Sequence, residues 1–131
     1  MVEREYHSGT WQRDRSFSPA VTTKGGTMVW VAGHGAPIDD KGNSLAGNFA
    51  AQARQCFKNM QVTLERTGAT LADMVTMTVF ITDSRFGDEF VQIRNEFFEQ
   101  NKWPASAMIT CDGLAKPAMM VEIQGIAVVE D

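Results

Sequence analysis

The sequence predicts an α+β domain in which one mixed β-sheet carries two helices on one of its faces. Two observations indicate this class. Apolar residues recur at three- and four-residue steps in two segments, as in amphipathic helices, whereas five other segments are β-branched or alternate between apolar and polar residues. The segments follow one another in the order ββαβαββ, with no internal repeat or linker. We therefore expect a single domain over residues 1–131, with residues 1–16 as an N-terminal extension and first strand.

The first strands are predicted on either side of a Gly25-Gly26 turn. SPAVTT leads into this turn and TMVWVAG follows it, and such β-branched and aromatic runs are typical of strands. Because a glycine pair joins them, we expect these two strands to form a hairpin. Residues 33–47 are rich in Gly, Asp, Asn and Pro and have no periodicity, so we expect a surface loop there.

Both helices are predicted from their apolar stripes. The first stripe consists of Phe49, Ala53, Phe57, Met60 and Leu64. This helix should begin after Asn48 and end near Gly68, since glycine commonly ends helices. The second stripe consists of Phe90, Ile93 and Phe97. Ser84 is a suitable cap for this second helix, and Arg94 is expected to point away from the core.

Three strands complete the sheet. In VTMTVFIT, residues Val75, Met77, Val79 and Ile81 share one face, and Thr76, Thr78, Phe80 and Thr82 share the other. The second face would favour association if it were exposed. SAMITC and MMVEIQGIAVV follow as the last two strands. The last strand contains a carboxylate, Glu122, and a buried charge requires a partner, water or a function.

Composition excludes several classes of protein. The net charge is −4 and no Lys/Arg cluster occurs, so neither nucleic acid nor an acidic lipid surface is an expected partner. No apolar stretch approaches the roughly 20 residues that cross a bilayer, and the N-terminus is polar, so we expect a cytoplasmic protein. Cys56 and Cys111 have neither CxxC nor His-rich spacing, which argues against a zinc site. Both are expected to be buried thiols.

Several motifs occur together in a familiar order. SFSPAV, VAGHGAPI, the stretch from AAQARQCF to FITD, WPASA and LAKPAMMVEIQGIAV resemble the Rid/YjgF family of reactive-intermediate deaminases, over roughly residues 17–128. The resemblance implies a chorismate-mutase-like fold and a homotrimer with small-molecule pockets between its subunits. It also implies hydrolysis of enamine or imine intermediates to a keto acid and ammonia, with no metal or organic cofactor.

The resemblance also assigns site residues. Glu122 stands at the position of the family's last-strand Glu, which helps to position water. Phe17 occupies the position of a pocket aromatic residue but lacks its hydroxyl. Ala32 replaces a common Ser, and His34 follows Gly33 where Gln is common. The alternatives are a Glu122 that is merely paired with a Lys or Arg at a subunit seam, and a His34 that lies on the surface as a loop residue.

Ser106 is the main departure from the family. In WPASA it follows the Pro-Ala pair, where the deaminase branch has the Arg that binds the substrate carboxylate, and one hydroxyl cannot replace a bidentate guanidinium. Activity on standard 2-imino acids is therefore expected to be weak. Arg94 either approaches the same cleft from the second helix or lies on a solvated helix face.

Two functions remain open from the sequence. One is a hydrolase that acts on a small imine, enamine or related amino compound. The other is a non-catalytic trimer that binds a small metabolite in the same cleft. A ribonuclease, as reported for some relatives, is disfavoured because the chain is acidic.

Overall fold

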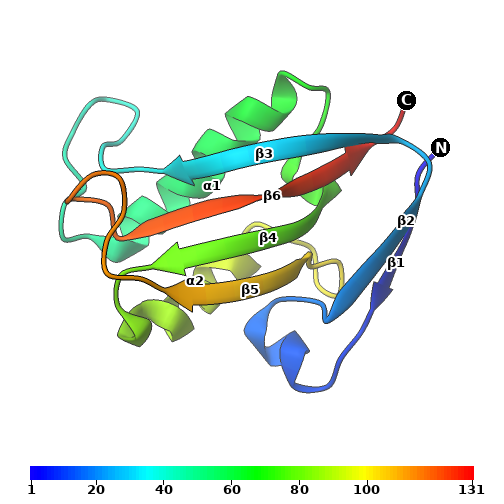
Figure 1. Cartoon of the computed structure of the whole chain (residues 1–131), viewed down its shortest axis with the longest axis horizontal. Helices are drawn as coiled ribbons and strands as arrows, with labels where there is room; N and C mark the ends of the chain where they lie inside the picture. The colour runs from blue at the N-terminus through cyan, green and yellow to red at the C-terminus, as the bar shows by residue number, and fades with distance from the viewer.

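Four strands form one mixed sheet in the order β3-β6-β4-β5 (Figure 1). The computed structural model describes all 131 residues. The strands are β3 (Thr27–Gly35), β4 (Met74–Ile81), β5 (Ala105–Thr110) and β6 (Val121–Val129). β6 is antiparallel to both β3 and β4, whereas β4 and β5 are parallel. The predicted mixed sheet is confirmed.

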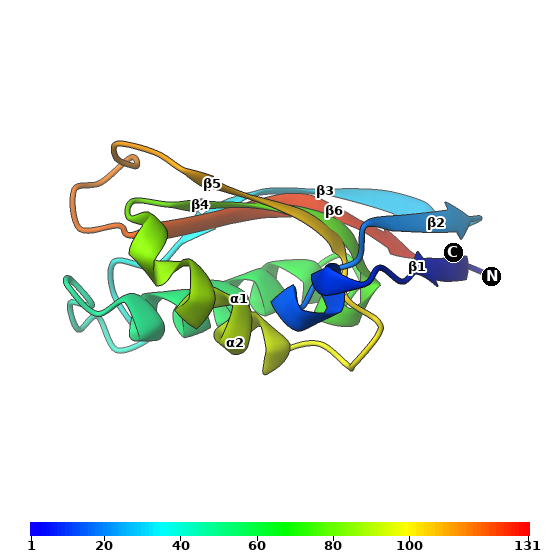
Figure 2. The same ribbon diagram turned by 90° about the horizontal axis from the view of Figure 1, so that it is seen from below.

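Both helices lie on the same face of this sheet, as Figure 2 shows. They are α1 (Phe49–Glu65) and α2 (Gly87–Asn95). Three short 3-10 helices accompany them, η1 (Trp11–Arg15), η2 (Leu71–Asp73) and η3 (Ser84–Phe86). The opposite face of the sheet carries no helix, so the molecule has one covered and one open sheet face. No helix has the length and apolar character that a membrane span requires.

The ends of α1 agree with the sequence prediction. The Asn48 side chain accepts a hydrogen bond from the Ala51 N–H at 3.1 Å, which caps one of the free donors of the first turn. At the other end, Gly68 adopts a φ of +80° and the Ala69 N–H returns to the Leu64 carbonyl. The start of the second helix differs from the prediction, because Ser84 lies in η3 and α2 begins only at Gly87.

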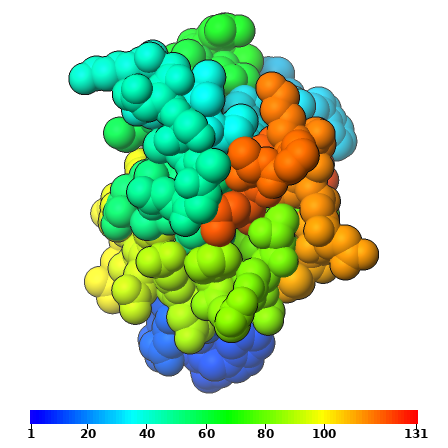
Figure 3. All heavy atoms as spheres, turned by 90° about the vertical axis from the view of Figure 1, so that its left-hand side faces the viewer, coloured from blue at the N-terminus to red at the C-terminus, as the bar shows by residue number.

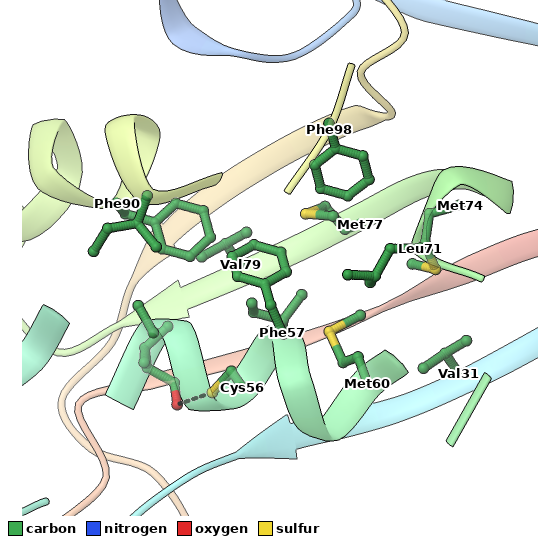
Figure 4. Close-up of a cluster of buried hydrophobic side chains, with 14 of the residues drawn as sticks. Val31, Cys56, Phe57, Met60, Leu71, Met74, Met77, Val79, Phe90 and Phe98 are labelled. Atoms are coloured by element: carbon green, nitrogen blue, oxygen red, sulfur yellow. Dashed lines mark hydrogen bonds between the residues drawn. The ribbon is translucent and has the colours of Figure 1, made fainter. Parts of the chain in front are cut away.

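The core lies between the helices and the sheet. Phe57 of α1 stacks on Phe97 with 4.6 Å between ring centroids, and Figure 4 shows it among residues of α1, α2 and β4. Full burial of such a ring contributes about 1.5–3 kcal/mol. β4 alternates as predicted except at one position. A bulge next to Met74 places this residue in the core and leaves the predicted Val75 only partly buried.

The predicted hairpin around Gly25-Gly26 is wrong. β2 (Ala20–Lys24) pairs with an N-terminal strand, β1 (Glu3–His7), whereas β3 pairs with β6. Both glycines have a positive φ, 78° and 81°, so the pair does form a sharp turn. The turn directs the chain from one sheet into another, which glycine content alone does not reveal. β3 also extends to Gly35, into the segment predicted as loop.

A buried glutamine joins the two loops that precede α1 and β6. Gln52 Nε2 donates to the carbonyls of Leu45 and Ala118 at 2.9 and 2.8 Å. Its Oε1 accepts the Met120 N–H at 2.9 Å. Figure 3 shows residues 36–47 (cyan) and 111–120 (orange) at the same end of the molecule. These bonds fix the start of β6 and thereby the position of Glu122.

Candidate functional site

Arg94 is the most constrained charged residue of the chain. It lies in the last turn of α2 and is only 2% exposed. Its Nη1 donates to Ser106 Oγ at 2.7 Å, and its Nη2 donates to the Arg15 carbonyl at 2.9 Å. The solvated helix face, one of the two alternatives for this residue, is therefore excluded. Arg94 approaches Ser106 from the second helix, which is the other alternative.

No carboxylate compensates this buried cation. None of the ion pairs within the chain includes Arg94. Its guanidinium carbon lies 5.8 Å from the Phe17 ring centroid and 5.3 Å from that of Phe90, within the range of cation–π attraction. Burial, and then the nearby charge of Arg15, lower the pKa of Arg94 to about 10. The side chain is thus still positive at neutral pH.

The hydrogen bonds of Arg94 leave some of its capacity unused. A guanidinium has five N–H donors, and Nε, Nη1 and Nη2 of Arg94 each make one bond within the chain. One N–H on each terminal nitrogen is therefore free. Such a pair of donors suits the bidentate binding of a carboxylate.

Ser16 holds the guanidinium in place, a role that no sequence pattern indicated. The residue is buried and adopts a left-handed φ of +55°, which is uncommon for serine. Its Oγ donates to the Val91 carbonyl at 2.8 Å and accepts from Arg94 Nε at 3.2 Å. The strained backbone places a hydroxyl between α2 and its arginine.

A hollow of about 310 Å³ opens beside Arg94. It is lined by Trp11, Arg15, Phe17, Val91, Arg94, Ser106 and Met108. The rings of Trp11 and Phe17 meet edge to face at 5.6 Å. The structure thus brings together three of the predicted site residues, Phe17, Arg94 and Ser106. It adds Trp11 and Arg15 from η1, a segment whose fold the sequence did not predict.

Glu122 lies elsewhere, on the open face of the sheet. It pairs with Gly35 of β3 and with Phe80 of β4. Its carboxylate packs over Gly33, where a Cβ would meet Glu122 Oε2, so a larger residue at position 33 would displace the carboxylate from its present place. Glu122 is half-buried and makes no ion pair or hydrogen bond within the chain. The Glu122 carboxylate in the last strand is therefore neither deeply buried nor paired within one subunit.

The two cysteines differ in exposure. Cys56 is fully buried, and burial followed by the charge of Glu122 raises its pKa to about 12. This thiol is buried, as predicted, and it stays protonated and unreactive at neutral pH. Cys111 is only partly buried, so the expectation that both thiols lie in the core is wrong for Cys111. It lies at the end of β5, where the sheet edge is open to solvent.

Ala32 and His34 point in different directions because of a bulge in β3 between Val31 and His34. Ala32 is exposed on the open face. His34 faces α1 instead, where its Nδ1–H donates to the Ala32 carbonyl at 2.7 Å and its Nε2 lies 2.8 Å from Thr63 Oγ1. A carbonyl accepts only, so the Nδ1–H tautomer is fixed and Nε2 is left for the Thr63 hydroxyl. The structure therefore does not bring the His34 ring to Glu122.

A single subunit keeps the two groups of candidate residues apart. Ser106 is in register with Met77, which is buried in the core, whereas Glu122 is in register with Phe80 on the open face. The two residues lie on opposite sides of the sheet, and their strands are two spacings, about 10 Å, apart. We call the hollow around Arg94, with Arg15, Phe17 and Ser106, the cation half, and we call Glu122 with its surroundings on the open face the carboxylate half.

The structure thus defines a small α+β protein with a buried arginine on one side of its sheet and an unpaired carboxylate on the other. No group of three His, Cys, Asp or Glu side chains is placed to hold a metal ion. The chain belongs to the Rid/YjgF family, since the family model described as endoribonuclease L-PSP matches residues 12–129. The resemblance of the sequence motifs is thereby confirmed.

Known relatives agree with this assignment. The chain is 32% identical over 112 residues to a RutC family protein of Pyrococcus horikoshii, covering 85% of each chain. It is similar to the crystal structure of RidA from the Antarctic bacterium Psychrobacter sp. PAMC 21119, with 29% identity, a TM-score of 0.72 and coverage of 87% and 89%. A conserved Rid family protein of unknown function, YyfB from Yersinia pestis, shares the fold, with a TM-score of 0.79, 23% identity and coverage of 96% and 98%.

Proposed function

We propose that this protein is a cofactor-independent hydrolase of small imines or enamines, with an active site formed by two subunits. The cation half of one subunit binds an acidic group of the substrate through Arg94. The carboxylate half of a neighbour supplies Glu122, which activates water. The observation that carries the proposal is the buried Arg94, which has free donors and no counter-ion in its own chain.

The reaction needs only a proton carrier and water. Glu122 accepts a proton as the oxygen of water adds to the carbon of the protonated imine, which forms a carbinolamine. The same carboxyl group then returns this proton to the nitrogen. The C–N bond breaks as the carbinolamine hydroxyl gives its proton to the Glu122 carboxylate, and a carbonyl compound and ammonia leave, with the last proton passing from Glu122 to ammonia or water. A general base of this kind contributes about 10²–10⁴-fold in rate. Arg94 holds the substrate so that its imine carbon faces the carboxylate of the other subunit.

The structure changes the interpretation of Ser106. The sequence predicts weak activity on standard 2-imino acids because Ser106 replaces the family's Arg, and it leaves open whether Arg94 supplies a cation instead. The hydrogen bond from Arg94 Nη1 to Ser106 Oγ supports the second possibility. Imines that carry a carboxylate therefore remain suitable substrates. The cation reaches the site from α2 rather than from β5.

A homotrimer is the assembly that we propose. The two halves need a second copy, since they lie on opposite sides of the sheet in one chain. The open face also presents apolar side chains to solvent, including Trp30, which is 73% exposed, as well as Ile109 and Met28. Exposed apolar surface of this kind typically marks an interface. Two unpaired cysteines suit the reducing cytoplasm, where we place the trimer.

Turnover and assembly can be tested together. An amino-acid oxidase generates the imine, semicarbazide traps what is not hydrolysed, and the protein should reduce the trapped fraction in proportion to its concentration. Sedimentation should give a trimer at micromolar concentration. Ligand binding without any turnover would instead support the non-catalytic binding trimer, and a monomer would contradict the shared site.

A further inference from the structure

We infer that the substrate carries a second acidic group, which Arg15 binds at the edge of the cation half, so that the preferred substrates are imines of short dicarboxylic acids. This inference rests on the proposed function and names its substrate class. Arg15 is then a specificity-determining residue, supplied by η1 rather than by the sheet.

The charge of the pocket supports a doubly negative ligand. Its lining contains two arginines, Arg15 and Arg94, and no acidic residue. The other lining residues are apolar or neutral. The chain as a whole carries a net charge of −4, so the lining of this hollow is positively charged on a protein that is negatively charged overall. Because a ligand with one negative charge balances only one of the two arginines, a dianion is the better electrostatic match.

The present partner of Arg15 can be replaced at little cost. Arg15 Nη1 lies 2.5 Å from Asp88 Oδ1, and the Asp88 side chain is 87% exposed. Ion pairs in such exposed positions contribute little to stability. A ligand carboxylate, held in the hollow by its other end, can therefore take the place of Asp88, which returns to water.

The two guanidinium groups are held on one framework. Arg94 Nη2 donates to the backbone carbonyl of Arg15 at 2.9 Å, so the residue that carries the second cation is tied to the first. Ser16, the next residue, is bonded to Arg94 Nε as well. The chain thus keeps the backbone of Arg15 next to the Arg94 guanidinium. The hollow of about 310 Å³ is at the small end for ligand sites, which favours a short diacid.

Two product analogues of equal carbon number test the inference. Calorimetric titration of the intact protein with 2-oxoglutarate and 2-oxopentanoate compares a dianion with a monoanion. One added charge-assisted pair should make 2-oxoglutarate bind roughly 10-fold more tightly or better. Arg15→Gln should reduce this ratio to near one, because it should lower the affinity for 2-oxoglutarate far more than the affinity for 2-oxopentanoate. Asp88→Asn, which frees Arg15, should increase the affinity for 2-oxoglutarate.

Arg13→Gln is the matched control. Arg13 lies in the same short helix and is exposed, but it does not line the hollow, so this change removes one positive charge without touching the site. It should keep the preference for the dianion. Equal affinities in the wild type, or a preference that survives Arg15→Gln, would overturn the inference alone. If neither acid binds the wild type, the role of Arg94 and the proposed function fail as well.

Discussion

The cation half and the carboxylate half hold their charges in opposite ways. Arg94 is buried, and each of its nitrogens donates to a neutral oxygen, one each from Arg15, Ser16 and Ser106. Glu122 is half-buried and has no bonded partner, with a glycine opposite its carboxylate. Burying an unpaired charge is costly, so stability alone does not explain the position of Arg94. A free carboxylate, by contrast, can take and return protons.

The difference indicates how the work is divided. A group that positions a ligand must be rigid, and its removal should affect binding. A group that moves protons must be accessible, and its removal should affect turnover but neither fold nor binding. The predictions that follow separate these two roles.

Glu122→Gln should have the largest effect on turnover. Loss of the general base should lower the rate by about 10²–10⁴-fold, because the amide keeps the shape but cannot accept a proton. Since Glu122 has no partner within its chain, stability should change by no more than about 0.5 kcal/mol. Thermal melts and size-exclusion runs check this beside the activity assay. A variant that dissociates yet still binds ligand normally would show that Glu122 is a structural charge, paired across the seam.

Arg94→Met should affect binding most. Without the guanidinium, which can form two charge-assisted bonds, the affinity for a carboxylate should fall by roughly 10²-fold. Titration with 2-oxopentanoate measures it. Arg94→Lys is the control, because it keeps the charge but not the planar fork, and it should retain part of the affinity. Unchanged binding in Arg94→Met would place the anion elsewhere.

Alkaline pH should weaken binding through the same residue. Burial and Arg15 lower the pKa of Arg94 to about 10, so its charge is lost as pH rises through this value. Affinity for the anion should be constant from neutral pH to about 9 and then fall toward tenfold for each further unit. The free energy of unfolding should change in the opposite direction. Above pH 10 Arg94 is protonated in the unfolded chain but loses its proton in the folded one, so its contribution to stability rises with pH. Arg15→Gln should move the midpoint of this loss of affinity to higher pH, because it removes a charge that lowers the pKa of Arg94.

Ser106→Ala should have the smallest effect. It removes the 2.7 Å bond that holds Arg94 Nη1 but leaves the bonds to Ser16 and Arg15. A neutral partner of this kind contributes about 0.5–1.5 kcal/mol, which corresponds to roughly 2- to 10-fold in affinity. The same titration measures it. A loss as large as that of Arg94→Met would mean that Ser106 itself binds the ligand.

The fold was largely predictable from local patterns. The stripe from Phe49 to Leu64 and the alternation in β4 each follow from contacts with one core, so periodicity is sufficient. Strand pairing was less predictable, because the partner of β3 lies about a hundred residues away in β6. The turn at Gly25-Gly26 is compatible both with a β2-β3 hairpin and with the observed pairing of β3 with β6.

The site was predictable only in part. Arg94 follows Phe90 by four residues and therefore lies on the same side of α2, but its charge argued against a buried position. Its partner Ser16 is 78 residues distant, and no local pattern records such a contact. The orientation of His34 was not predictable for a related reason, because the β3 bulge that turns its ring toward α1 depends on pairing with β6.

The shared site can be tested most directly by complementation between subunits. Arg94→Met and Glu122→Gln subunits should each be inactive alone, yet mixed oligomers made by co-expression or by refolding together should regain activity. In a mixed oligomer, some interfaces place the Arg94 of a Glu122→Gln subunit next to the Glu122 of an Arg94→Met subunit, and such an interface has both intact residues. The double variant mixed with Glu122→Gln is the control and should stay inactive. Failure of the two single variants to complement in verified mixed trimers would contradict a site built from both halves.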